Sequence, residues 1–105
     1  MDIKKLVITI VVESDVEILR NLLQKQKVDG YDEIDTQYFS PLEPPPHRFG
    51  NWFGQGMLPA NQKIFLAVMA DNESDLLIEK LGRLKKNGEL GYLRYYRMDV
   101  EQLGE

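Results

Sequence analysis

Two stretches of the chain are apolar at nearly every position. Residues 6–12 read LVITIVV, and residues 63–70 read KIFLAVMA. In each stretch both alternating sets of side chains are apolar, which is typical of a central strand that is covered on both faces. Residues 31–39 and 92–98 alternate only in part and carry more polar side chains. The pattern therefore predicts edge strands for these two segments.

Residues 14–27 are predicted to form a first helix. Ser14 and Glu17 have the spacing of a capping box, in which each side chain bonds the backbone of the other at a helix start. Apolar residues then recur at helical spacing. They are Val16, Leu19, Leu22 and Leu23.

A second helix is predicted to open within residues 71–75, with Asn72 or Ser74 as its cap. Asn87 and Gly88 are expected to end it. Its apolar stripe consists of Leu77, Ile78, Leu81 and Leu84.

The predicted order is strand, helix, strand, long loop, strand, helix, strand. Two βαβ halves of this kind predict an α+β protein with a ferredoxin-like βαββαβ sandwich: a four-stranded antiparallel sheet with two helices on one face. Strands one and three are then central, and strands two and four lie at the edges. A chain of 105 residues supports one domain, which we place at residues 1–105.

The face of the sheet opposite the helices is expected to be polar if it meets water. Here both faces of the two central strands are apolar, so a further layer should cover the second face. We expect another copy of the chain to provide this layer, in a homo-oligomer whose sheets face one another. In the first central strand the two sets are Leu6, Ile8, Ile10 and Val12 on one side and Val7, Thr9 and Val11 on the other; in the second they are Ile64, Leu66 and Val68 against Phe65, Ala67 and Met69.

Residues 40–62 form a predicted loop between the second and third strands. This segment holds all five prolines of the chain, its one histidine and its one tryptophan. Pro44, Pro45 and Pro46 cannot enter a helix interior or a central strand. Loops longer than about 12–15 residues usually have a function in a compact domain, so function is expected here.

The predicted loop is also rich in apolar side chains, unlike a disordered linker. One interpretation is a lid, in which Phe49, Trp52 and Phe53 fold back onto the core of the domain. The other is a docking surface for a partner, with Arg48, Phe49, Trp52 and Phe53 as its contacts.

Charge and composition exclude several classes of protein. The net charge of −4 argues against nucleic-acid binding, which needs clustered Lys and Arg. The absence of cysteine excludes disulfides and thiolate metal sites. A helix that crosses a bilayer needs an apolar run of about 18–20 residues, and this chain has none of that length. We therefore expect no membrane insertion and a cytoplasmic location.

The sequence offers little for catalysis, so we expect no enzymatic activity. His47 and Glu43 are a weak candidate pair for a metal site, because one imidazole and one carboxylate lack a recognisable ligand spacing. The glycine-rich residues 50–56 match neither a dinucleotide-binding turn nor a P-loop and are interpreted as a flexible hinge.

Four basic residues near the end of the second helix and in the fourth strand could hold an anionic ligand together with backbone amides of residues 87–91. A solvated helix end beside an exposed strand is the alternative. The four are Lys85, Lys86, Arg94 and Arg97.

The whole pattern resembles the PII-like signalling proteins, which are small ferredoxin-like chains with a long T-loop between strands two and three. Residues 27–32 (KVDGYD) resemble the turn after the first helix of that family, and residues 95–102 (YYRMDVEQ) resemble its final strand. The chain differs at residues 38–40, where the family has glycines, and at residues 87–91, where the glycine-lysine loop of the family is abbreviated. Nucleotide binding is therefore left open.

The resemblance implies a trimeric regulator that senses a small molecule, often an adenine nucleotide, and contacts a membrane transporter or an enzyme through the long loop. A ligand at the subunit cleft would shift this loop between free and docked states. The alternative resemblance is to the CutA-like proteins, which are trimers associated with divalent metals. A metal-binding trimer or small enzyme centred on His47 is the corresponding second hypothesis.

Overall fold

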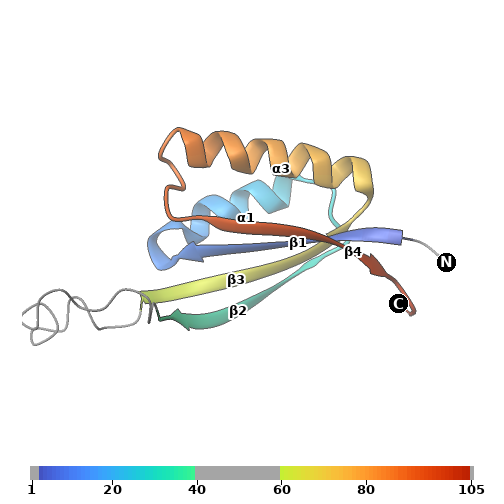
Figure 1. Ribbon diagram of the computed structural model, residues 1–105, viewed down its shortest axis with the longest axis horizontal. Coiled ribbons are helices and arrows are strands. Elements are labelled where there is room, and N and C mark those ends of the chain that lie inside the picture. The colour runs from blue at the N-terminus through green and yellow to red at the C-terminus, as the bar shows by residue number, and fades with distance from the viewer. Residues whose placement is uncertain (1–2, 40–59, 105) are drawn as a thin grey trace, which may run out of the picture.

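Four strands form one antiparallel sheet in the computed structural model, which describes residues 3–39 and 60–104 (Figure 1). The strands are β1 (Ile3–Val12), β2 (Tyr31–Tyr38), β3 (Ala60–Met69) and β4 (Arg94–Glu101). Their spatial order is β2-β3-β1-β4. The two strands that are apolar on both faces are therefore central, and the two more polar strands are the edges, which confirms the prediction.

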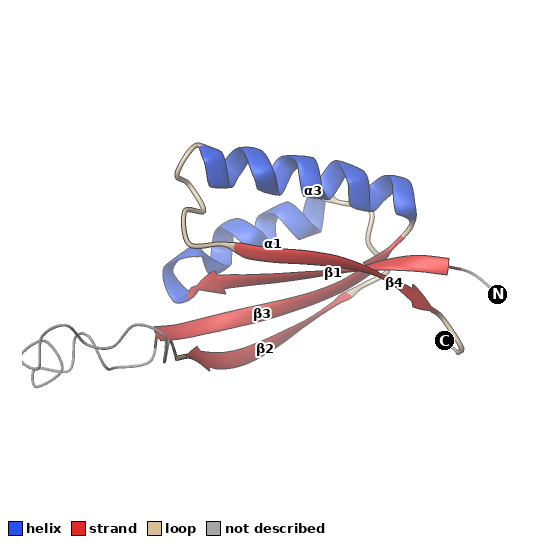
Figure 2. Ribbon diagram, in the orientation of Figure 1, coloured by secondary structure: helices blue, strands red, loops and turns tan. Residues whose placement is uncertain are grey.

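Both helices cover the same face of this sheet (Figure 2). A short 3-10 turn, η1 (Glu13–Asp15), leads into α1 (Val16–Lys25), and α3 (Asp71–Lys86) connects β3 to β4. Each helix joins two strands of the sheet, so the element order is βαββαβ. The ferredoxin-like α+β fold is confirmed.

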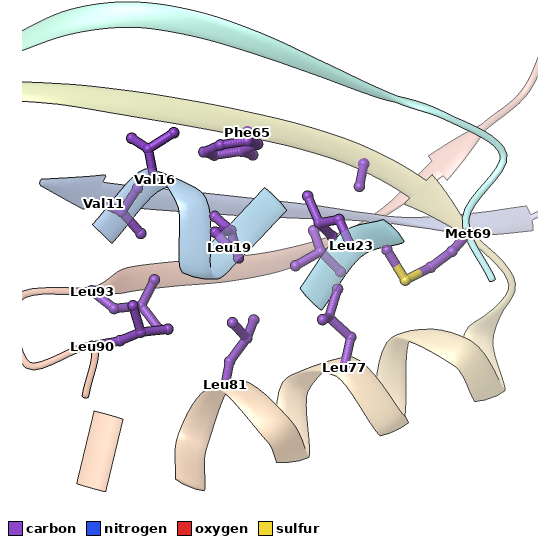
Figure 3. Packing of buried hydrophobic residues seen from close by; sticks show 12 residues of the cluster. Val11, Val16, Leu19, Leu23, Phe65, Met69, Leu77, Leu81, Leu90 and Leu93 are labelled. Carbon is purple, nitrogen blue, oxygen red and sulfur yellow. The ribbon is translucent and has the colours of Figure 1, made fainter. Parts of the chain in front are cut away.

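The hydrophobic core lies between the sheet and the helices (Figure 3). Alternate residues of the central strands point into this layer, because successive side chains of a strand lie on opposite faces. Leu77 and Leu81 of α3 point toward the same layer, as the helical spacing predicted. The buried apolar residues are Val7, Val11, Val16, Leu19, Leu23, Phe65, Ala67, Met69, Leu77, Leu81, Leu90 and Leu93.

Several predicted boundaries are wrong by two or three residues. β1 begins at Ile3 because Lys4 and Lys5 pair with β4 in the sheet although their side chains are polar. β3 begins at Ala60, so residues 60–62 belong to a strand and not to the predicted loop of residues 40–62. β4 starts at Arg94 and continues to Glu101.

The predicted helix caps are also wrong. α1 follows the 3-10 turn directly, and its N-cap residue Asp15 makes no side-chain cap bond, so Ser14 and Glu17 form no capping box. The N-cap of α3 is Ala70, which places both Asn72 and Ser74 inside the helix. The end of α3 agrees with the prediction, since Asn87 is the C-cap and Gly88 has a left-handed φ of 86°.

Candidate functional site

The face of the sheet opposite the helices carries a broad apolar surface, which we call the open face. The strand registers place its side chains, because directly paired residues of neighbouring strands point to the same face. None of its members is buried by the described residues. They are Leu6, Ile8, Ile10 and Val12 of β1, Ile34 and Tyr38 of β2, Ile64, Leu66 and Val68 of β3, and Tyr96, Met98 and Val100 of β4.

The open face is large enough to form a protein interface. Its strands are 8–10 residues long. At about 3.3 Å per residue and about 4.8 Å between strands, four such strands span on the order of 500 Å² per copy. Two copies in contact would bury on the order of 1,000 Å², the lower limit for a specific interface. Polar side chains border the apolar centre, as at known interfaces, and they include Lys4, Asp32, Gln62 and Arg94.

Arg94 is the one basic residue of the predicted anion site that points to the open face. Its guanidinium carbon lies 4.4 Å from the ring centroid of Tyr38, and its Nη2 donates a hydrogen bond to Gln62 Oε1 at 3.0 Å. Both partners are neutral. Among residues 3–39 and 60–104, no carboxylate forms an ion pair with this half-buried guanidinium.

The other three basic residues of the predicted site lie elsewhere. Lys85 Nζ donates to the backbone oxygens of Gly91 and Leu93, at 3.3 and 2.5 Å, and so holds the α3–β4 connection in place. Lys86 is exposed at the end of α3.

Arg97 lies at the opposite end of the same helix. Its Nη1 donates to Asp75 Oδ1 at 2.5 Å and to Ser74 Oγ at 3.2 Å, both in the first turns of α3. Asp75 and Lys85 are about 15 Å apart along a helix, at 1.5 Å per residue. The structure therefore does not gather the four basic residues into one cluster.

A polar cleft of about 680 Å³ lies on the helix side of the sheet, between the start of α1 and the ends of β2 and β3 that border residues 40–59. Acidic, basic and amide side chains share its lining. The lining residues are Glu13, Val16, Glu17 and Arg20 on one side and Asp35, Thr36, Gln37, Asn61, Gln62 and Lys63 on the other.

The two cations of this cleft are already paired through Glu33. Arg20 donates to both carboxylate oxygens of Glu33 at 2.7 Å, and Lys63 donates to Oε1 at 3.2 Å. The hydrogen bond from Arg20 has the largest effect on Glu33 and, together with that from Lys63, lowers the pKa of this carboxyl to about 2. The pKa of Lys63 is raised by its hydrogen bonds to Asp35 and Glu33. Since the charges of Arg20 and Lys63 are already balanced by carboxylates, the cleft is a weak site for a bound anion.

The sequence did not single out this network. Arg20, Glu33 and Lys63 come from α1, β2 and β3, and no local motif joins them. Alternation along residues 31–39 could have placed Glu33 on the helix side of the sheet, but only the strand register brings it beside Lys63.

The predicted docking residues and the predicted metal residues lie outside the described part of the chain. In residues 3–39 and 60–104, no group of three or more His, Asp or Glu side chains could hold a metal ion. Over the same ranges, none of the helices has the length and apolar character needed to cross a membrane. The predicted site residues that lie outside the described ranges are Glu43, His47, Arg48, Phe49, Trp52 and Phe53.

Comparisons with known proteins show a likeness of fold. No family model matches the chain, and a search of curated proteins finds no match. Among solved structures, the chain is similar to a DUF3240 family protein from Shewanella baltica OS155, with a TM-score of 0.70 and 15% sequence identity. The match covers 100% of this chain and 98% of the other. At this identity the likeness concerns the fold, and the PII-like resemblance stays a hypothesis.

Proposed function

We propose that the chain is a non-enzymatic regulatory protein of the PII-like type. Three copies assemble through their open faces, a small ligand binds the assembly, and residues 40–59 carry the contact with a transporter or an enzyme. The ligand changes the affinity for this partner by favouring one arrangement of the assembly over another.

The open face is the observation that supports this proposal most strongly. In the described structure, both helices lie on one side of the sheet, and the apolar residues on its other side have no cover. Exposed apolar patches of this size mark interaction sites. A cyclic assembly with the faces turned toward a common axis would cover them with identical surfaces.

A matched pair of charge substitutions tests this assembly. Leu66 lies at the centre of the open face, paired with Ile8, whereas Leu76 is 50% exposed on α3. We expect Leu66→Asp to be monomeric by light scattering, because the charge would be buried without a cationic partner and directly opposite Asp32. We expect wild type and Leu76→Asp to have three times the mass of one chain. A wild type that is monomeric at micromolar concentration in every buffer, phosphate included, would contradict the proposal.

The ligand part of the proposal has a separate test. Calorimetric titration of wild type with ATP and ADP should show saturable binding to the assembly if the ligand is an adenine nucleotide. Absence of heat and of any thermal shift with both nucleotides would remove nucleotide sensing and leave the docking part standing.

A further inference from the structure

Arg94 places a positive charge on a surface that the proposed assembly buries. We propose that the assembled open faces enclose a small oxyanion, of the size of phosphate or sulfate, held by Arg94 from each copy. This inference rests on the proposed assembly and adds to it a ligand class and a binding residue at the interface between copies.

The first step concerns the charge. In the described chain Arg94 is half-buried, so part of this residue meets water. When a second copy covers the open face, this water is displaced. Burial of an ion without a counter-charge is strongly unfavourable, so a negative group must accompany the arginine into the interface.

The second step concerns the partners of Arg94. Tyr38 supplies the face of an aromatic ring, and Gln62 accepts one hydrogen bond through its side-chain oxygen. Both orient the guanidinium, and neither carries a negative charge. A guanidinium has five N–H donors, so several remain for a ligand.

The third step concerns symmetry. In a cyclic assembly, equivalent residues lie at the same height along the axis and at equal distances from it. The Arg94 side chain reaches inward from the edge strand β4 to Gln62 of β3 and Tyr38 of β2, so the copies would bring these charges toward one another across the open faces. Their mutual repulsion would oppose assembly, and an anion between them would reverse the effect. The planar fork of arginine matches the oxygens of phosphate and sulfate, which favours an oxyanion as the bound species.

Among the described strand residues, one carboxylate lies on the open face and offers an alternative to a bound anion. Asp32 of β2 shares this face, since it pairs with Leu66 of β3. Asp32 lies on the edge strand β2, and Arg94 lies on the opposite edge strand β4. Across the sheet, Asp32 is level with Tyr96, which is two residues from Arg94 and on the same face. If Asp32 of a neighbouring copy paired with Arg94, no anion would be needed, so the experiment includes this residue.

The experiment measures association by sedimentation equilibrium in buffer with potassium phosphate, and in potassium chloride at matched ionic strength. We expect about 10 mM phosphate to strengthen wild-type association at least tenfold. Arg94→Met keeps a long unbranched side chain and removes the charge, so it should associate tightly in both salts. Asp32→Asn should keep the phosphate response of wild type. Calorimetry with phosphate should show binding to assembled wild type and none to Arg94→Met.

Each other outcome overturns the inference. Wild type that is oligomeric but indifferent to phosphate refutes the anion and leaves the assembly intact. If Asp32→Asn dissociates and wild type is indifferent to phosphate, the counter-charge of Arg94 is the Asp32 carboxylate of a neighbouring copy. Arg94→Met with the full phosphate response places the ion elsewhere. Wild type that is monomeric in every buffer overturns the inference and the proposed assembly together.

Discussion

Glu33 joins cations from two different elements, Arg20 of α1 and Lys63 of β3. Its side chain is only 22% exposed, and the bond with Arg20 is bidentate, which is the stronger geometry for such a pair. This residue therefore fastens the start of the first helix to the sheet near the cleft.

Glu33 should make stability depend on pH. Its pKa is about 2 in the folded chain and ordinarily 4.5, so its contribution is complete above pH 4.5 and is lost as the pH falls toward 2. We expect Glu33→Gln to lower the free energy of unfolding by roughly 1–2 kcal/mol at pH 7 and to have little effect near pH 2.

Urea unfolding at several pH values measures this difference. Glu89→Gln is the control, because Glu89 is exposed and has no ion pair among the described residues. Equal effects of the two substitutions at pH 7 would show that the network adds nothing to stability.

The basic residues show what the sequence could and could not give about the site. Arg94 and Arg97 are three positions apart in one strand, so alternation alone places them on opposite faces. Their grouping as one site could have been rejected from the sequence. The salt bridge of Arg97 with Asp75 and the hydrogen bonds of Lys85 with the backbone depend on how α3 lies over the sheet, which no local pattern encodes.

At the scale of elements, α3 depends on its buried stripe more than on its ends. It begins without a side-chain cap bond, and Ser74 Oγ bonds Asp71 O within the first turn at 2.7 Å. Leu77 and Leu81, both fully buried, fix the helix to the core. The sequence predicted this stripe correctly from its spacing, but it predicted the start from residue preferences, which several nearby residues satisfy equally well.

Leu77 and its neighbour Leu76 give a matched pair for this element. Leu77 is 0% exposed and Leu76 is 50% exposed in the same helix. We expect Leu77→Ala to lower the free energy of unfolding by about 2–5 kcal/mol, because it leaves a cavity in the core. Leu76→Ala should change it by less than about 0.5 kcal/mol. Chemical denaturation measures both, and equal losses would contradict the assignment of the core.

At the scale of the whole molecule, the fold could be predicted from two strands that are apolar on both faces. Residues 6–12 and 63–70 had to be central, and the observed strand order agrees. The same two-sided pattern predicted an apolar face opposite the helices, and the structure shows it. The open face could thus be predicted from the apolar residues along the strands. The molecule that covers it could not, because an apolar surface does not specify what binds to it.

Protection of the open face in solution tests the central claim most directly. The chain has no cysteine, so a single introduced thiol reports on its own surroundings. Met98 lies on the open face and is 52% exposed in the described chain, and Tyr92 is 76% exposed in the α3–β4 connection. These positions provide a test residue and a control.

The measurement is the rate of maleimide labelling of Met98→Cys and Tyr92→Cys at several protein concentrations. We predict that Met98→Cys reacts at least tenfold more slowly than Tyr92→Cys at high concentration, and that the difference disappears on dilution as the copies separate. Equal and rapid labelling of both thiols at every concentration would contradict the assembly on which the account depends.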